Sequence, residues 1–171
     1  MAMHMHALRL AALCFGLLAA VAPLRAQETG DTSDYRQSGW VAQCVAPGRS
    51  APADCVLEQK LLIAKSGDLV AAVKIRVPAE PRTPAMMVQL PKGLFLPAGV
   101  ALRVDDGEAL KLDLQTCDDN GCYAGLAVSE DLLGALRSGA SLHLGVRNLD
   151  KKNFDIILSL QGFTVGYRKI E

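Results

Sequence analysis

An apolar residue stands at every second position of the stretch Val73-Lys74-Ile75-Arg76-Val77. This alternation places the three apolar side chains on one face of a pleated strand and the two basic side chains on the other. The same period recurs at 100–104, 110–114, 142–147, 156–160 and 163–167, and further strands are expected at 40–45 and 56–64. The pattern therefore predicts short strands that share one core.

The breaks between these stretches contain turn-forming residues. Glycine stands in Lys65-Ser66-Gly67-Asp68, Asp105-Asp106-Gly107 and Asp118-Asp119-Asn120-Gly121, where it can adopt a positive φ without steric cost. The segment 78–84 contains three prolines, which exclude a central strand. We expect this segment to be a loop that crosses between two sheets.

One short helix is predicted near 129–138. Ser129 is a favoured N-cap residue, Glu130 and Asp131 suit the first turn, and Gly139 marks the end. Together with about eight to ten short antiparallel strands, this helix favours an all-β sandwich. A closed barrel is the alternative architecture.

The first 26 residues have the pattern of an export signal. The stretch from Leu10 to Ala22 is almost wholly apolar, yet it is shorter than the roughly 20 residues that a membrane-spanning helix needs. Leu24-Arg25-Ala26 ends in the small residue typical of a cleavage site. Cleavage after Ala26 would leave 27–171, which we expect to be a single periplasmic or secreted domain without a transmembrane segment.

The charge balance argues against nucleic acid as a partner. Of the 18 basic residues, Arg9 and Arg25 would leave with the signal, so 16 would face 18 acidic residues, a formal net charge of −2. Proteins that bind phosphate backbones usually gather a basic surplus on one face. The adjacent basic pairs Lys151-Lys152 and Arg168-Lys169 are expected to be solvated turn and tail residues.

The remaining cysteines form two close pairs in sequence, Cys44 with Cys55 and Cys117 with Cys122. Small exported domains are often stabilised by disulfides. Four cysteines allow three pairings, and the sequence does not select one; we expect the two local pairings because each would join the flanks of one turn. Zinc or thiol–disulfide chemistry is disfavoured because the spacings do not suit it and only His143 follows the signal.

Residues that could support catalysis are few. His143 lies in the polar register of its strand, and the chain lacks a Gly-x-Ser-x-Gly nucleophile elbow. The acidic pairs Asp105-Asp106 and Glu130-Asp131 are the candidates for a carboxylate-dependent hydrolase. Asp118-Asp119-Asn120 is too short to form a calcium loop. We predict no catalytic residue, metal or cofactor, and we expect Trp40 to anchor the core.

Five ordered segments resemble the invasion-associated locus B family of alphaproteobacteria. They are Trp40–Cys44, Cys55–Gln59, Leu90–Val100 with Asp105-Asp106-Gly107, Cys117–Cys122, and Ser159–Phe163. Each segment alone is common, so the order and spacing of all five carry the resemblance, which spans essentially the whole of 27–171.

The resemblance implies an exported immunoglobulin-like β-sandwich with no known catalytic residues. It also implies that Cys44, Cys55, Cys117 and Cys122 are bonded positions, and that some relatives assist entry into host cells. The expected function is a non-enzymatic envelope or secreted interaction module with an unidentified protein partner in the envelope or on a host cell surface. The alternative is a periplasmic ligand-binding protein or a carboxylate-dependent hydrolase.

Overall fold

The computed structural model describes residues 34–46, 48, 53–78 and 81–171. The expected signal segment, residues 1–26, lies outside this part of the chain. Within it the chain forms eleven strands, two α-helices and one 3-10 turn. None of the helices in these ranges is long and apolar enough to cross a membrane.

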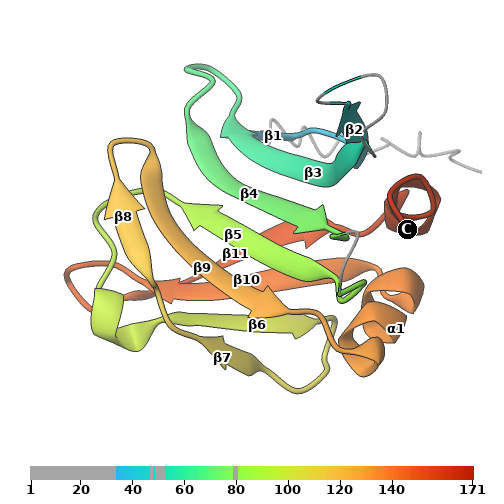
Figure 1. Cartoon of the computed structure of the whole chain (residues 1–171). Coiled ribbons are helices and arrows are strands. Elements are labelled where there is room, and N and C mark those ends of the chain that lie inside the picture. The colour runs from blue at the N-terminus through green and yellow to red at the C-terminus, as the bar shows by residue number, and fades with distance from the viewer. Residues whose placement is uncertain (1–33, 47, 49–52, 79–80) are drawn as a thin grey trace, which may run out of the picture. The chain divides into compact units, whose positions relative to one another are not determined.

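The strands form two antiparallel sheets that pack in layers (Figure 1). The seven-stranded sheet has the order β1-β3-β4-β5-β9-β8, with β2 also paired to β3. Its strands are β1 Tyr35–Gln37, β2 Val41–Val45, β3 Asp54–Ile63, β4 Leu69–Arg76, β5 Ala85–Leu90, β8 Thr116–Asp118 and β9 Gly121–Ala127. The four-stranded sheet has the order β11-β10-β6-β7, with β6 Val100–Val104, β7 Leu110–Leu112, β10 Ser141–Arg147 and β11 Asn153–Ser159. The helical elements are η1 Leu96–Ala98, α1 Glu130–Ser138 and α2 Phe163–Tyr167.

The two separate sheets confirm the sandwich-like architecture and not the closed barrel. The strands number eleven, against about eight to ten expected from alternation, because three-residue strands such as β1 and β8 are too short to show a period. The immunoglobulin-like connection of the strands stays a prediction of the resemblance.

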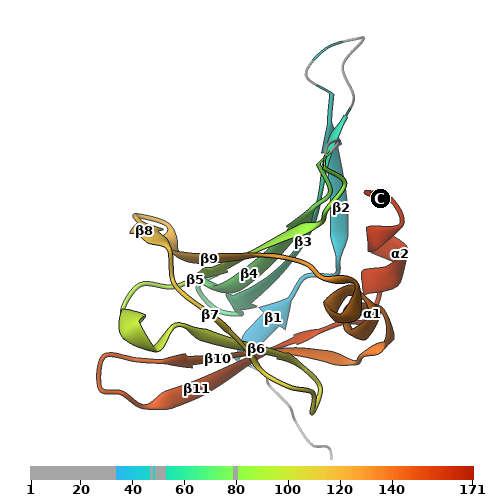
Figure 2. The ribbon, with the colours of Figure 1, turned by 60° about the horizontal axis from the view of Figure 1, so that its bottom comes forward.

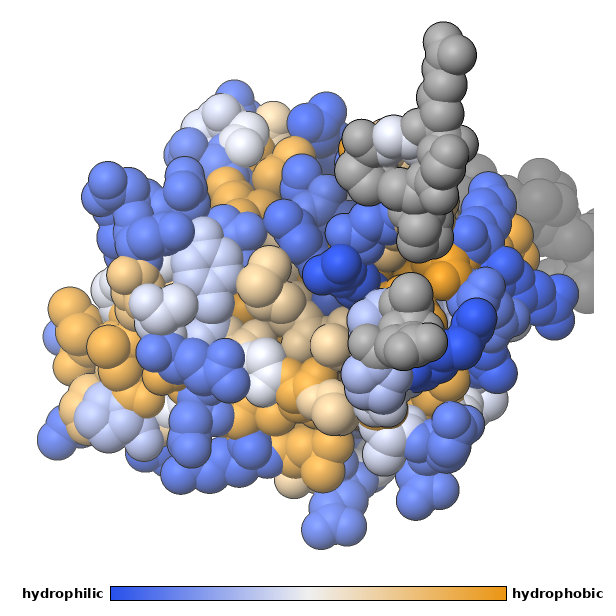
Figure 3. All heavy atoms as spheres, in the orientation of Figure 1, coloured by the Kyte–Doolittle hydropathy of each residue, from blue (hydrophilic) through white to orange (hydrophobic). Residues whose placement is uncertain are grey.

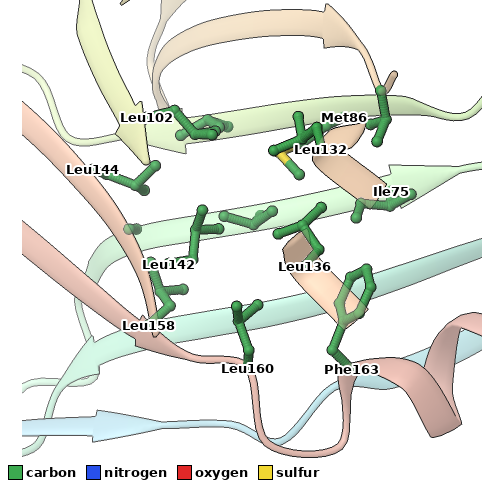
Figure 4. Packing of buried hydrophobic residues seen from close by; sticks show 14 of the residues in the cluster. Ile75, Met86, Leu102, Leu132, Leu136, Leu142, Leu144, Leu158, Leu160 and Phe163 are labelled. Atoms are coloured by element: carbon green, nitrogen blue, oxygen red, sulfur yellow. The ribbon is translucent and has the colours of Figure 1, made fainter. Parts of the chain in front are cut away.

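The core lies between the sheets and is built from the alternating apolar positions. Figure 4 shows Leu102 and Leu144 of the smaller sheet facing the space that Ile75 and Met86 of the larger sheet also enter. All four side chains are at most 1% exposed. Burial of each side chain of this size stabilises the fold by about 1.5–3 kcal/mol.

Helix α1 forms where the sequence predicts it. The Ser129 side chain accepts a hydrogen bond of 3.2 Å from the Leu132 backbone N–H, and this bond satisfies a donor left free in the first helical turn. Leu132, Leu133 and Leu136 are buried, so the helix closes one end of the core (Figure 4).

The expected last strand at 163–167 is wrong, because these residues form helix α2. Gly162 turns the chain with φ +86. Phe163, Tyr167 and Ile170 are all buried, and their spacing of four and three residues is that of a helix face. Over only five residues, an alternating strand and one helical turn both place apolar residues at the first and last positions. Alternation alone therefore predicted a strand where the structure has a helix.

The segment 78–84 does not cross between sheets. It connects β4 to β5, which are antiparallel neighbours in the same sheet, with Arg76 opposite Ala85. The Pro84 carbonyl accepts a hydrogen bond of 2.8 Å from the Val128 N–H. As expected, the prolines keep this connection out of the hydrogen-bond ladder, because proline has no backbone N–H to donate. They do not determine which sheet the next strand joins.

Both disulfides are the local ones that we expected. Cys44–Cys55 joins directly opposed residues of β2 and β3, and Cys117–Cys122 does the same for β8 and β9. In the chain-entropy model each bond contributes about 2–3 kcal/mol by limiting the unfolded chain. Disulfides of this kind indicate an extracytoplasmic protein.

Tyr167 gives the fold a measurable dependence on alkaline pH. The side chain is 2% exposed, and burial, partly offset by Arg137, raises the pKa of its phenol. The contribution of Tyr167 to stability is therefore complete below the unfolded pKa of about 10 and is lost as the pH rises through the folded pKa. We expect the free energy of unfolding, measured with urea, to fall less steeply above about pH 10 in Tyr167→Phe than in the parent. Equal slopes would contradict this assignment.

Candidate functional site

The outer face of the four-stranded sheet carries the only pair of small residues that oppose each other across its central strands, among the residues described. Gly145 of β10 lies opposite Ala101 of β6, and Ala101 lies opposite Lys111 of β7. On the other side Gly145 lies opposite Asp155 of β11. One row across the sheet therefore contains a carboxylate, two small residues and an ammonium group.

A groove with a volume of about 660 Å³ lies over these small residues. Its lining includes Phe95, Ala101, Lys111, Gly145, Arg147 and Phe154. This volume falls within the range of roughly 300–1,000 Å³ that is common for small-molecule sites. The groove is therefore large enough for a ligand.

The two cations that line the groove make few contacts with the described part of the protein. The Nε of Arg147 donates to the Asn153 side-chain oxygen at 2.8 Å, and its terminal nitrogens have no partner among the described residues. Lys111 has no hydrogen-bond or ion-pair partner among the described residues. Both side chains can therefore serve as donors to a bound anion.

His143 belongs to a charged cluster beside the groove. Its Nδ1 lies 2.7 Å from Oδ2 of Asp155, and Nη2 of Arg103 lies 3.3 Å from the same oxygen. A guanidinium group can only donate and a carboxylate accepts, so the arrangement is consistent with two donors on one Asp155 oxygen. Nη2 of Arg103 and Nδ1 of His143 lie 3.1 Å apart because both donate to this one oxygen.

This cluster lacks the parts of a hydrolase. Within the described ranges no serine, threonine or cysteine side chain bonds to His143, whereas an activated nucleophile must lie within hydrogen-bond reach of its base. The cluster therefore neutralises Asp155 and fixes three side chains on the sheet surface.

The acidic pairs expected as catalytic candidates do not converge. Asp105 accepts hydrogen bonds from the backbone N–H groups of Ala140 and Ser141, so it holds the start of β10. Glu130-Asp131 lies in the first turn of α1. In the part of the chain that the structure describes, no three His, Cys, Asp or Glu residues are placed to hold a metal ion.

Asp118-Asp119-Asn120 forms the tip of the β8–β9 hairpin. Oδ1 of Asp118 accepts hydrogen bonds from the Asn120 N–H at 2.7 Å and from the Tyr123 hydroxyl at 3.1 Å. The Asn120 bond is the main cause that lowers the pKa of Asp118, whereas burial raises the pKa of Tyr123. This carboxylate therefore stabilises its own turn.

The sequence reasoning missed the groove. Ala101 and Gly145 stand at positions of their strands where the alternation otherwise places charged residues such as Arg103 and Arg147. Two small residues at positions that are otherwise charged were the sequence signal that could have indicated a groove. The opposition of the two residues depends on the pairing of β6 with β10, which is distant in sequence.

Comparisons with known proteins agree with the fold. A family model described as invasion associated locus B (IalB) protein matches residues 40–171. The invasion protein B homologs of Brucella abortus strain 2308 and of B. abortus biovar 1 strain 9-941 are each 24% identical over 163 residues, which cover 94% of this chain and 92% of the relative. The crystal structure of invasion associated protein B from Bartonella henselae superposes with a TM-score of 0.68 and 18% identity, over 79% of this chain and 94% of that one. At this identity the structural likeness concerns the fold alone.

Proposed function

Because the chain belongs to the invasion associated locus B family, we propose that it is an exported, non-enzymatic interaction module that binds a protein partner in the envelope or on a host cell surface. Export uses the cleavable signal 1–26 and delivers residues 27–171 to the periplasm or the medium. The match of the family model to 40–171 is the observation that carries the proposal. The relatives are described as invasion protein B homologs, and the family is not a known enzyme family.

Two loops at one end of the sandwich are the proposed contact surface. Leu149, in the β10–β11 turn, is 68% exposed, and Leu96, in η1, is 46% exposed; we call these two residues the apolar tip. The Phe95 N–H donates to the Arg147 carbonyl at 2.9 Å, which fixes the two loops side by side. Figure 3 shows hydrophobic atoms beside hydrophilic ones at this end, where Figure 1 places η1.

The turn holds Leu149 in a defined position. The Asn148 side-chain oxygen accepts from the Lys152 N–H at 2.9 Å, and the Asn148 carbonyl accepts from the Lys151 N–H at the same distance. Because these bonds already fix the backbone of the turn, a partner that covers Leu149 has to order mainly its side chain. This supports the tip as a contact surface.

Affinity capture tests the proposal. The tagged full chain is captured from envelope fractions and from host membranes, and a chain lacking residues 1–26 serves as the control that remains in the cytoplasm. We expect one specific protein to be enriched, to capture the chain in return, and to be lost with Leu149→Glu because a buried unpaired carboxylate is costly. Val165→Glu is the matched control, since Val165 is similarly exposed, at 63%, on α2. Failure to recover any protein that depends on Leu149 would refute the tip as the contact surface.

A second candidate function, the binding of a small ligand outside the cytoplasm, is supported by the groove. The carboxylate-dependent hydrolase has no such support, because Asp105 binds backbone amides and Glu130 lies on α1.

A further inference from the structure

The groove has a low floor because two opposed strands carry almost no side chain there. A Cβ atom placed on Gly145 would lie 3.3 Å from the Ala101 Cβ, so the space above these residues begins close to the backbone. Larger residues surround the floor: Lys111 continues the row across β7, and Arg147 lies two positions along β10. The shape is that of a trough with charged ends.

The charges around the floor favour an anion. Among the described residues, neither Lys111 nor the terminal nitrogens of Arg147 have a hydrogen-bond or ion-pair partner. The carboxylate in the same row, Asp155, already accepts from Arg103 and lies against His143. The cations are therefore not neutralised from within the groove, and a bound carboxylate or phosphate would form charge-assisted hydrogen bonds with them.

One wall of the groove is apolar. Phe95, Pro97 and Ala98 line it, and the Phe95 side chain is only partly buried. An aromatic side chain that is partly open to water is stabilised when an apolar ligand surface covers it. The groove thus offers one charged region and one apolar region to the same molecule.

We propose that this groove binds a small organic anion, a carboxylate or phosphate group that carries an apolar body. The charged group lies between Lys111 and Arg147, and the apolar body extends over the Ala101–Gly145 floor against Phe95. This site rests on the second candidate function, ligand binding, and does not require a protein partner at the apolar tip.

Octanoate and phenyl phosphate are suitable probes in a titration of the oxidised domain followed by NMR. We expect both to shift the backbone amide signals of Ala101, Lys111, Gly145 and Arg147 in a saturable way. Octanol, which lacks the charge, should shift them much less, and added salt should weaken octanoate binding. Octanol binding as tight as octanoate would contradict the anionic part of the site.

Two variants separate the charged region from the floor. Lys111→Met keeps the stem and removes the charge, so octanoate affinity should fall about tenfold. Ala101→Leu fills the trough at an exposed strand position and should abolish binding without changing any charge. Lys65→Met, in the exposed turn between β3 and β4, is the matched control and should bind like the parent. Unchanged affinity in Lys111→Met and Ala101→Leu, with parental thermal stability, would overturn the proposal.

Vesicles of phosphatidylglycerol distinguish a lipid source of the same chemistry from a free anion. Co-sedimentation that is lost in Ala101→Leu supports a lipid headgroup in the groove, and octanoate binding without co-sedimentation supports a free anion. If neither probe nor vesicle depends on Ala101, the site is refuted. Capture of a protein through Leu149 would still stand, so the two proposals fail separately.

Discussion

Replacement of Phe163 by alanine is expected to lower the free energy of unfolding by about 3–5 kcal/mol, the range for a buried aromatic residue. Phe163 is fully buried. Its ring meets Trp40 edge to face with centroids 5.0 Å apart and stacks on Tyr167 at 5.7 Å. A helix of five residues is too short to be stable alone, so this packing holds α2 in place.

Urea unfolding of the oxidised domain measures the effect, with Val165→Ala as the control. Val165 belongs to the same helix but is 63% exposed, so its replacement should change the free energy by no more than about 0.5 kcal/mol. A loss below about 1 kcal/mol in Phe163→Ala would mean that the core closes around the cavity and that α2 is held by other contacts.

The contacts around Phe163 bring several of the family segments together in space. Trp40 donates through Nε1 to the Ser159 carbonyl at 3.0 Å, and Gln59 donates to the same carbonyl at 2.9 Å. Residues of the first, second and last family segments thus meet at one junction between the two sheets. Trp40 is partly buried against the core, so its expected role as a core anchor is confirmed.

The start of the third family segment meets the fourth where β5 pairs with β9 in the larger sheet. Leu90 of β5 lies opposite Cys122 of β9, and the Gln89 side chain donates to the Asn120 carbonyl at 3.1 Å. Segments that are far apart in sequence therefore meet at two places in the fold, one between the sheets and one within the larger sheet. Neither of these two contacts lies in the groove, although Phe95 and Gly99 of the third segment line it.

Strands with a long alternating pattern could be predicted from sequence because burial on one face imposes the period of two. β5 carries this signal as well, since Met86, Val88 and Leu90 are all buried, although the sequence analysis did not include it among the expected strands. α2 could not be separated from a strand over five residues. The groove could not be predicted either, because its shape depends on the register between β6, β7 and β10, which local periodicity does not encode.

Gly99→Ala is expected to destabilise the domain by at least about 3 kcal/mol, through backbone strain and a steric clash. Gly99 has φ +66 and ψ −154, a region that residues with a Cβ rarely adopt. A Cβ atom at this position would stand 2.3 Å from the Leu112 carbonyl oxygen. To relieve this contact β7 must move away from β6, although Val100 and Leu112 are paired there.

Gly134→Ala is the matched control, and its effect should have the opposite sign. Gly134 lies within α1, and nothing lies within 4 Å of a Cβ built there. Alanine at such a helical site should raise the free energy of unfolding by about 0.5–1 kcal/mol. Urea unfolding of both variants gives the comparison. If Gly99→Ala unfolds at the same urea concentration as the parent, the backbone at Gly99 does not hold β6 and β7 together, and Lys111 of β7 is positioned over the groove by other contacts.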